Sequence, residues 1–193
     1  AVSGVENIAY TGTGGNDTAD KKGKNGPTTA APAAQPPATQ TEVPQHQVQV
    51  QVVGQYIKDL SFENPNVDKL VGGIGEQPNL NVEVSVNARP VNEGQGLYES
   101  QIDFKATAVN KIGTIYDLEL VYAGMFAIKG LPKEAVEPFL LINCPSILFP
   151  FLRRMVADIT REGGFPPLLL DPIDFAGLFM RRQQEIAAKT AKS

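Results

Sequence analysis

The stretch LNVEVSVNA, residues 80–88, decides the fold class because its apolar and polar residues alternate without a break. One face of an extended chain would carry Leu80, Val82, Val84, Val86 and Ala88, and the other would carry Asn81, Glu83, Ser85 and Asn87. A period of two is typical of a β-strand with one covered and one solvated face. The stretch therefore predicts a sheet that is buried on one side only.

The same alternation recurs in three further segments, over residues 48–63, about 97–109 and 114–126. In the first of them the apolar side chains occupy even positions, namely Val48, Val50, Val52, Tyr56, Leu60 and Phe62. Gly54, beside the pair Val52 and Val53, indicates a bulge or a bend. Because no helical pattern separates the segments, the sequence predicts four consecutive strands that pair antiparallel.

Beyond residue 130 the spacing of the apolar residues becomes helical. We expect a short helix over 133–142 that is interrupted at Pro138. A longer helix is predicted over 146–162, because Gly163 and Gly164 follow it as a stop signal.

A third helix is predicted from Pro172 to about Ala188. Asp171 precedes Pro172 in the order that suits an N-cap followed by the first helical residue. Strands first and helices afterward predict an α+β fold, with helices packed on one face of a four-stranded antiparallel sheet.

The first 46 residues lack a hydrophobic pattern and are rich in Gly, Thr, Ala, Gln and Pro. Such a segment cannot bury enough apolar surface to offset its chain entropy. We therefore expect a disordered, low-complexity tail over 1–46 and one folded domain over 47–190. The tail does not begin with basic residues followed by an apolar run, as a secretory signal does, so a cytoplasmic location is expected.

Composition narrows the classes of function. The net charge of −4 and the pI near 5.1 argue against binding to a nucleic-acid backbone. The longest apolar stretches, 147–152 and 167–170, are far shorter than the roughly 20 residues that cross a bilayer. Cys144 is the only cysteine and His46 the only histidine, so we expect neither a metal site nor a cofactor.

Acidic side chains gather on the predicted polar faces of the first and fourth strands. Asp59 and Glu63 would lie about 13 Å apart along one strand, whereas Asp117 and Glu119 would share a face at about 6.6 Å. These carboxylates fit a solvated sheet face or a docking surface for a basic partner. A catalytic pair is the third interpretation.

The helical half carries a dense apolar cluster between residues 139 and 152. Its members are Phe139, Leu140, Leu141, Ile142, Ile147, Leu148, Phe149, Phe151 and Leu152. An ordinary core would account for some of them. The number exceeds what one small subunit should cover, which favours an interface between protomers and an exposed apolar groove.

Three separated stretches of the sequence are YIKDLSFENPN at 56–66, CPSILFPFLRR at 144–154 and GGFPPLLLDPIDFAGLFMRR at 163–182. In this order and spacing they resemble the SecB family of bacterial protein-export chaperones, and the resemblance extends over roughly 48–180. It implies a Greek-key sheet of four strands with two helices per subunit. It also implies a homotetramer, a dimer of dimers in which helices pack between two outer sheets.

The resemblance implies binding without catalysis. Family members hold unfolded secretory precursors in apolar surface channels without ATP, and then deliver them to the SecA ATPase. Asp59, Glu63 and Glu119 match the acidic positions that dock SecA, whereas Asp117 stands where a well-known relative has an apolar residue. The candidates for the client groove are Phe126, Leu148, Phe149, Leu168 and Leu170.

Two other functions remain open at this point. A SecB-like chaperone could serve one dedicated partner, such as an antitoxin, in place of general export. Independently of the resemblance, Asp117 and Glu119 could act as the carboxylate pair of an enzyme that modifies a small molecule.

Overall fold

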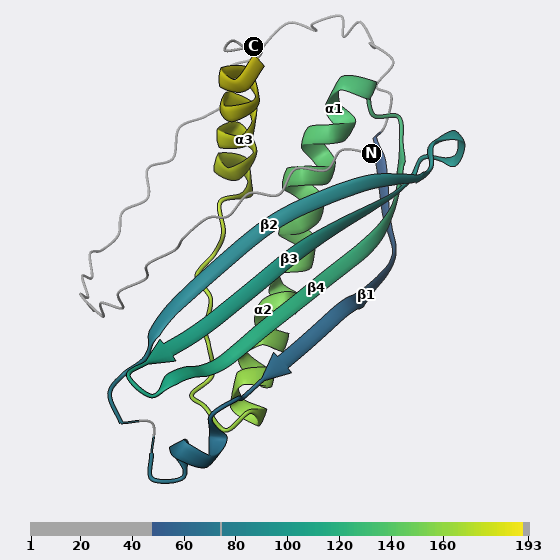
Figure 1. Cartoon of the computed structure of the whole chain (residues 1–193). Helices are drawn as coiled ribbons and strands as arrows, with labels where there is room; N and C mark the ends of the chain where they lie inside the picture. The colour runs from purple at the N-terminus through teal and green to yellow at the C-terminus, as the bar shows by residue number, and fades with distance from the viewer. Residues whose placement is uncertain (1–47, 74, 191–193) are drawn as a thin grey trace, which may run out of the picture. The chain divides into compact units, whose positions relative to one another are not determined.

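A computed structural model describes residues 48–73 and 75–190, in which four strands precede the helices along the chain (Figure 1). The strands are β1 (Gln49–Glu63), β2 (Asn79–Asn92), β3 (Leu97–Asn110) and β4 (Gly113–Lys129). Short 3-10 turns, η1 (Val67–Leu70) and η2 (Glu93–Gln95), lie in the first two connections. All four predicted strands are confirmed, and the predicted tail lies outside the described residues.

The strands form one antiparallel sheet in the order β1-β4-β3-β2. Tight connections join β2 to β3 and β3 to β4, whereas the longer connection from β1 to β2 crosses the width of the sheet. This is Greek-key topology, in which three hairpin-connected strands are completed by a fourth that lies beside the far one. It leaves β1 and β2 as the edge strands.

Two bulges in β1 set which of its side chains face the helices. The register shifts between Val52 and Gly54, as the sequence predicts, and again between Ile57 and Asp59. Because Ile57 pairs with Tyr122 on the helix side, Ile57 faces the helices and Tyr56 faces away from them. The prediction that placed Tyr56 on the covered face was therefore wrong, since Tyr56 lies between the two bulges, where the alternation is inverted.

The two helices predicted over 133–142 and 146–162 form one continuous helix. It consists of α1 (Lys133–Pro138), a π-helical segment η3 (Phe139–Asn143) and α2 (Cys144–Glu162). In the π-helical turn the backbone N–H of Cys144 donates to the carbonyl of Phe139, and the next position, Pro145, has no N–H to donate. Pro138 thus lies inside the helix and does not end it.

The carbonyl left over by that turn is satisfied from the sheet. Ser100 lies on β3, and its Oγ donates to the carbonyl oxygen of Leu140 at 2.8 Å. Ser100 is completely buried, so water cannot replace this bond. The contact joins the irregular turn of the helix to the middle of the sheet.

The last helix, α3 (Phe175–Thr190), begins three residues later than predicted. Its N-cap is Asp174, whose Oδ1 accepts from the backbone N–H of Gly177 at 2.9 Å. The Phe175 ring packs edge-on against Phe149 of α2, with ring centroids 6.0 Å apart. Contact with α2 therefore sets where α3 starts, and the Asp171–Pro172 signal does not.

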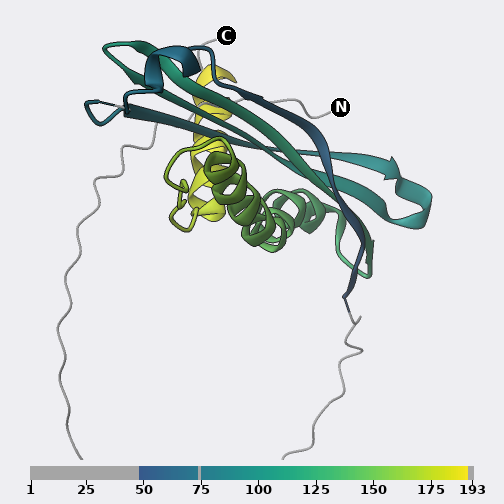
Figure 2. The same ribbon diagram turned by 90° about the horizontal axis from the view of Figure 1, so that it is seen from below.

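The core lies between the sheet and α2, because the helices cover one face of the sheet only (Figure 2). Phe126, Leu118 and Leu120 of β4 meet Leu148 and Leu152 of α2, all of them completely buried. The helix Lys133–Glu162 is long and apolar enough to cross a membrane by length and composition, but a core helix passes the same test. We interpret it as the core helix, since its buried side chains pack on the sheet.

Candidate functional site

The face of the sheet opposite the helices is organised in rows, because directly paired residues on neighbouring strands point the same way. One row crosses the sheet as Glu63, Asp117, Thr107 and Asn81. The next is Ser61, Glu119, Lys105 and Glu83, and the third is Asp59, Val121, Asp103 and Ser85. We call these three rows the acidic face.

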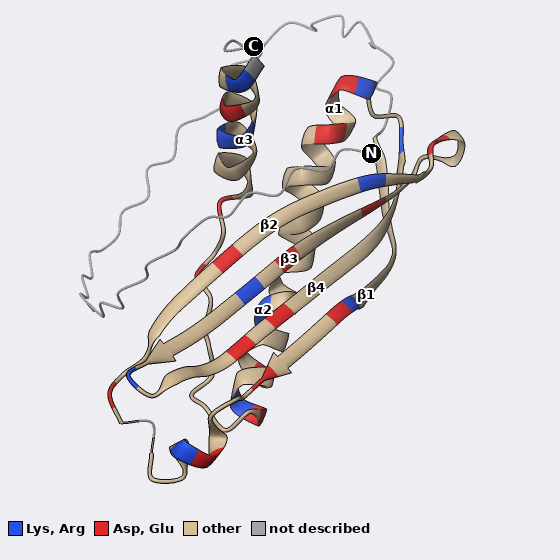
Figure 3. Cartoon of the chain, viewed as in Figure 1, with Lys and Arg blue, Asp and Glu red and all other residues tan. Residues whose placement is uncertain are grey.

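The acidic face carries a strong excess of negative charge (Figure 3). Its carboxylates are Asp59, Glu63, Glu83, Asp103, Asp117 and Glu119, and its only cation is Lys105. Six negative charges and one positive charge give a net charge of −5 on three rows of side chains. The strands thus bring together all four of the acidic residues singled out in the sequence, from β1 and β4.

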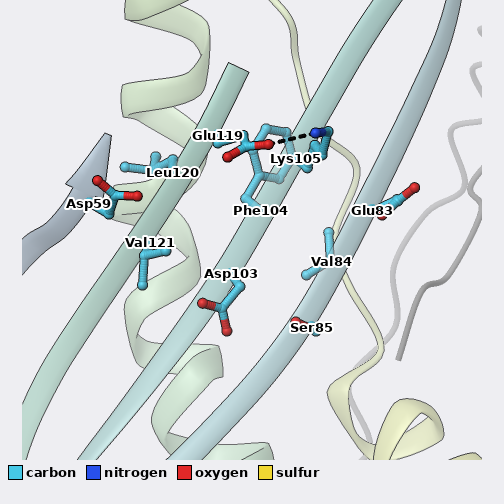
Figure 4. A pocket seen from close by; sticks show the side chains of 10 residues that line it. All are labelled: Asp59, Glu83, Val84, Ser85, Asp103, Phe104, Lys105, Glu119, Leu120 and Val121. Atoms are coloured by element: carbon cyan, nitrogen blue, oxygen red, sulfur yellow. Dashed lines mark hydrogen bonds and ion pairs between the residues drawn. The ribbon is translucent and has the colours of Figure 1, made fainter. Parts of the chain in front are cut away.

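Lys105 distinguishes the two carboxylates of β4, Asp117 and Glu119, from the two of β1, Asp59 and Glu63. Its Nζ lies 2.5 Å from Glu119 Oε1 (Figure 4), and it lies 3.6 Å from Asp117 Oδ2. The hydrogen bond to Glu119 raises the pKa of Lys105, although partial burial opposes the shift. Asp59 and Glu63, in contrast, pair with no other side chain of the described residues.

A shallow pocket of about 160 Å³ opens in the centre of the acidic face (Figure 4). It is lined by Asp59, Glu83, Val84, Ser85, Asp103, Phe104, Lys105, Glu119, Leu120 and Val121. Carboxylates from all four strands therefore border one hollow, with Val121 at its apolar floor. Such a hollow suits the end of a basic side chain of a partner.

Beside the acidic face lies a charged group that is buried. Glu99 of β3 is 3% exposed and accepts from Tyr56 Oη at 2.5 Å, Lys58 Nζ at 2.7 Å and both Nε and Nη2 of Arg89 at 2.9 Å. Burial alone would raise the pKa of Glu99, but the bonds from Arg89, Lys58 and Tyr56 outweigh it and lower the pKa to about 2. The network ties both edge strands, β1 and β2, to β3.

The candidates for the client groove lie on the opposite side of the sheet. Phe126 and Leu148 are completely buried, Phe149 and Leu170 are 8% exposed, and Leu168 is half-buried. The exposed apolar side chains nearby are Val50, Val52, Ile57 and Leu60 on the helix side of β1, with Ile147 and Phe151 on α2 and Leu169 in the connection to α3. The apolar surface open to a ligand is therefore formed by neighbours of the five candidates.

The sequence profile of a family described as preprotein translocase subunit SecB matches residues 43–186. The chain belongs to the SecB family. Its relatives include protein-export proteins SecB of Xanthobacter autotrophicus, 48% identical over 69% of this chain and 85% of theirs, and of Azorhizobium caulinodans, 44% identical over 68% and 81%. The identification made from three sequence motifs is thus confirmed.

A solved structure shares the SecB fold at much lower identity. It is a SecB-like chaperone of Mycobacterium tuberculosis in complex with a peptide from an antitoxin. The likeness has a TM-score of 0.51 and 15% identity, and it covers 64% of this chain and 90% of that one. At this identity the likeness supports the α+β fold of a SecB subunit and nothing about its ligands.

Sequence reasoning missed four residues of this surface. Lys105, Asp103 and Glu83 were not predicted because only the antiparallel register places them in the same rows as residues of β1 and β4. Glu99 was not predicted because side chains from two other strands pack on it, Lys58 reaching over β4 from β1 and Arg89 coming from β2. An available signal was the alternation in β3, since Glu99, Asp103 and Lys105 all occupy its polar positions.

Proposed function

We propose that this protein is a cytoplasmic export chaperone that holds unfolded secretory precursors without ATP and delivers them to SecA. The family membership supports the chaperone class, because the relatives at 41–48% identity are named as protein-export proteins. Members of this class bind and release clients without changing them chemically, so the protein is not proposed to be an enzyme. The delivery step rests on the acidic face.

The observation that supports the proposal is that the acidic residues matching the family's SecA-docking positions lie together on one open face. Asp59, Glu63 and Glu119 come from two strands and lie on adjacent rows, with Asp117 opposite Glu63. Opposite charges speed the encounter between two proteins and fix their relative orientation. We therefore assign SecA docking to Asp59, Glu63, Glu119 and Asp117.

Clients are proposed to bind on the opposite, apolar side. Unfolded chains expose scattered hydrophobes and unpaired backbone groups, and an apolar groove beside a free sheet edge fits both. Phe126, Leu148, Phe149, Leu168 and Leu170 would form or support the floor of that groove. The exposed rim would come from Phe151, Leu169 and the helix side of β1.

The test combines an aggregation assay with a binding assay. Light scattering by a chemically unfolded secretory precursor on dilution should fall in proportion to added chaperone, without nucleotide. SecA should bind the same protein, and the affinity should decrease as salt rises. Unchanged scattering at a several-fold excess of chaperone would contradict holding. SecA binding that is absent at low salt would contradict delivery.

The dedicated-partner alternative has weaker support. Its structural representative shares 15% identity with this chain, against 48% for a protein-export relative. The enzyme alternative is also disfavoured, because Lys105 already engages both Asp117 and Glu119 on an open sheet face. Suppression of aggregation for several unrelated precursors would separate general export from service to one partner.

A further inference from the structure

We infer that Lys105 competes with the basic groups of SecA for two carboxylates. Lys105 holds Glu119 and Asp117 in the free chaperone and must release them when SecA docks. The inference rests on the proposed docking at the acidic face and adds to it a residue that lowers the affinity. Lys105 lies in the same row as Glu119 and one row from Asp117, on the adjacent strand β3.

The geometry supports competition because the contacts of Lys105 are those that a partner cation would make. Its Nζ is 2.5 Å from Glu119 Oε1 and 3.6 Å from Asp117 Oδ2. The Lys105 side chain is 42% exposed and that of Glu119 is 50% exposed, so both groups meet solvent and can exchange partners. A surface ion pair of this kind is weak enough to be displaced.

The local charge explains why a cation is held here. Asp117 stands directly opposite Glu63, and like charges in directly paired positions repel. Lys105 offsets this repulsion in the free protein. Lys105 also borders the pocket with Asp59 and Glu119, so its positive charge offsets part of the negative potential that would attract a partner cation there.

The pairing imposes an order on docking. Asp59 and Glu63 have no side-chain partner among the described residues, so they are available to the first cations that arrive. Lys105 holds Oε1 of Glu119, so both oxygens of this carboxylate become available only when Lys105 leaves it. A partner segment with several cations is therefore favoured over one with a single Lys or Arg, because only the former can use the second group of carboxylates.

The test compares SecA binding by the full-length chaperone and its Lys105→Gln variant, with Lys111→Gln as the matched control. Lys111 carries the same charge and forms an ion pair with Glu76, but it lies in the turn between β3 and β4. We expect Lys105→Gln to tighten SecA binding by about three- to tenfold at low ionic strength and the control by less than about twofold. Lys105→Arg should behave like the wild type.

A double-mutant cycle shows whether the effect passes through Glu119. Glu119→Gln should weaken SecA binding more in the Lys105→Gln background than in the wild type, since Glu119 is then free to contact the partner. Thermal unfolding verifies that each variant is folded. Lys105 is on the surface, and its removal leaves only solvated carboxylates behind.

The outcomes separate this inference from the docking proposal. If Lys105→Gln binds SecA as the wild type does, or more weakly, while Asp59→Ala with Glu63→Ala abolishes binding, competition is wrong and docking stands. If the wild type itself fails to bind SecA at low salt, the docking proposal falls and the competitor role falls with it. Tightening by Lys105→Gln with no coupling to Glu119 would leave a general charge effect and would also overturn the competition.

Discussion

Glu99 shows how one residue can hold a sheet together from its open side. Its carboxylate receives hydrogen bonds from β1 and β2 at once, and the side chains of Lys58 and Tyr56 reach it across β4. Its hydrogen bonds from the cations Lys58 and Arg89 are charge-assisted and therefore stronger than bonds between neutral groups, and replacing the carboxylate with an amide loses that strength. We expect Glu99→Gln to lower the free energy of unfolding by about 2 kcal/mol at neutral pH.

The same group gives a pH dependence with a definite sign. The pKa of Glu99 is lowered from 4.5 to about 2. Its contribution to the free energy of unfolding is therefore complete above pH 4.5 and is lost as the pH falls toward 2. Urea unfolding of the wild type should show stability declining through this window. Glu99→Gln should flatten that decline, whereas the exposed Glu119→Gln should leave it in place. A wild-type decline that Glu99→Gln does not alter would contradict the assignment.

Asp59 and Glu63 test the docking face at the scale of single carboxylates. Their side chains point away from the helices, so Asp59→Ala with Glu63→Ala leaves Leu60 and Phe62 on the covered side undisturbed. The free energy of unfolding should change by less than about 0.5 kcal/mol. SecA binding should weaken strongly and lose part of its salt dependence, as measured by calorimetric titration at two salt concentrations.

Aggregation suppression by this double variant is the internal control, because clients are proposed to bind on the other side of the sheet. Equal SecA affinity for the wild type and the variant at low salt, with the fold intact, would return these carboxylates to an ordinary solvated face. The sequence alone placed both residues on the polar face correctly, because the second bulge of β1 lies before Asp59 and leaves the alternation after it unchanged.

At the scale of elements, the π-helical turn depends on one hydroxyl group. Ser100→Ala removes the donor to the Leu140 carbonyl inside the core, where an unsatisfied polar group costs about 1–3 kcal/mol. Ser146 makes the same kind of bond to the Ile142 carbonyl at 2.6 Å, but on the surface. Ser146→Ala should therefore cost much less. Chemical unfolding of the two variants should separate them by at least about 1 kcal/mol, and equal losses would contradict the role of Ser100.

The elements also show where sequence reasoning succeeds and where it stops. Alternation identified all four strands and the bulge near Gly54, because both are local properties of the chain. The start of α3 was misplaced because Asp171 and Asp174 are both good caps, and the Phe149–Phe175 contact selects between them. The helix interruption predicted at Pro138 is a change from α-helical to π-helical geometry without a break in the helix. Ser100 satisfies the Leu140 carbonyl in that π-helical turn.

At the scale of the molecule, a single subunit leaves apolar surface exposed on the side of the sheet that carries the helices. Phe151 is 48% exposed, Ile57 47% and Leu60 43%, and all three lie along β1 and the adjacent face of α2. Exposed apolar groups concentrated in this way suit a surface that another polypeptide contacts, either a bound client or a neighbouring subunit. The surplus expected from the sequence between residues 139 and 152 is small, because the subunit itself buries or partly buries all of these apolar residues except Ile147 and Phe151.

We predict a homotetramer in solution in which the helical half supplies most of the contacts. Sedimentation at micromolar concentration should give four times the 20.7 kDa of the subunit. Phe151→Glu should shift the distribution toward smaller species, whereas Glu83→Gln on the opposite face should not. A wild-type monomer at that concentration would refute the assembly without affecting the proposed role of the acidic face.

The two bulges of β1 act like a pair of compensating frameshifts. Each adds one residue, at Val53 and at Lys58, so the inward and outward phase is inverted only between them and is restored on both sides. Losing one extra residue would move every side chain before it in the strand to the opposite face of the sheet. Losing both would leave Val50 and Val52 on the helix side. The strand should therefore tolerate changes of length in pairs and resist them singly.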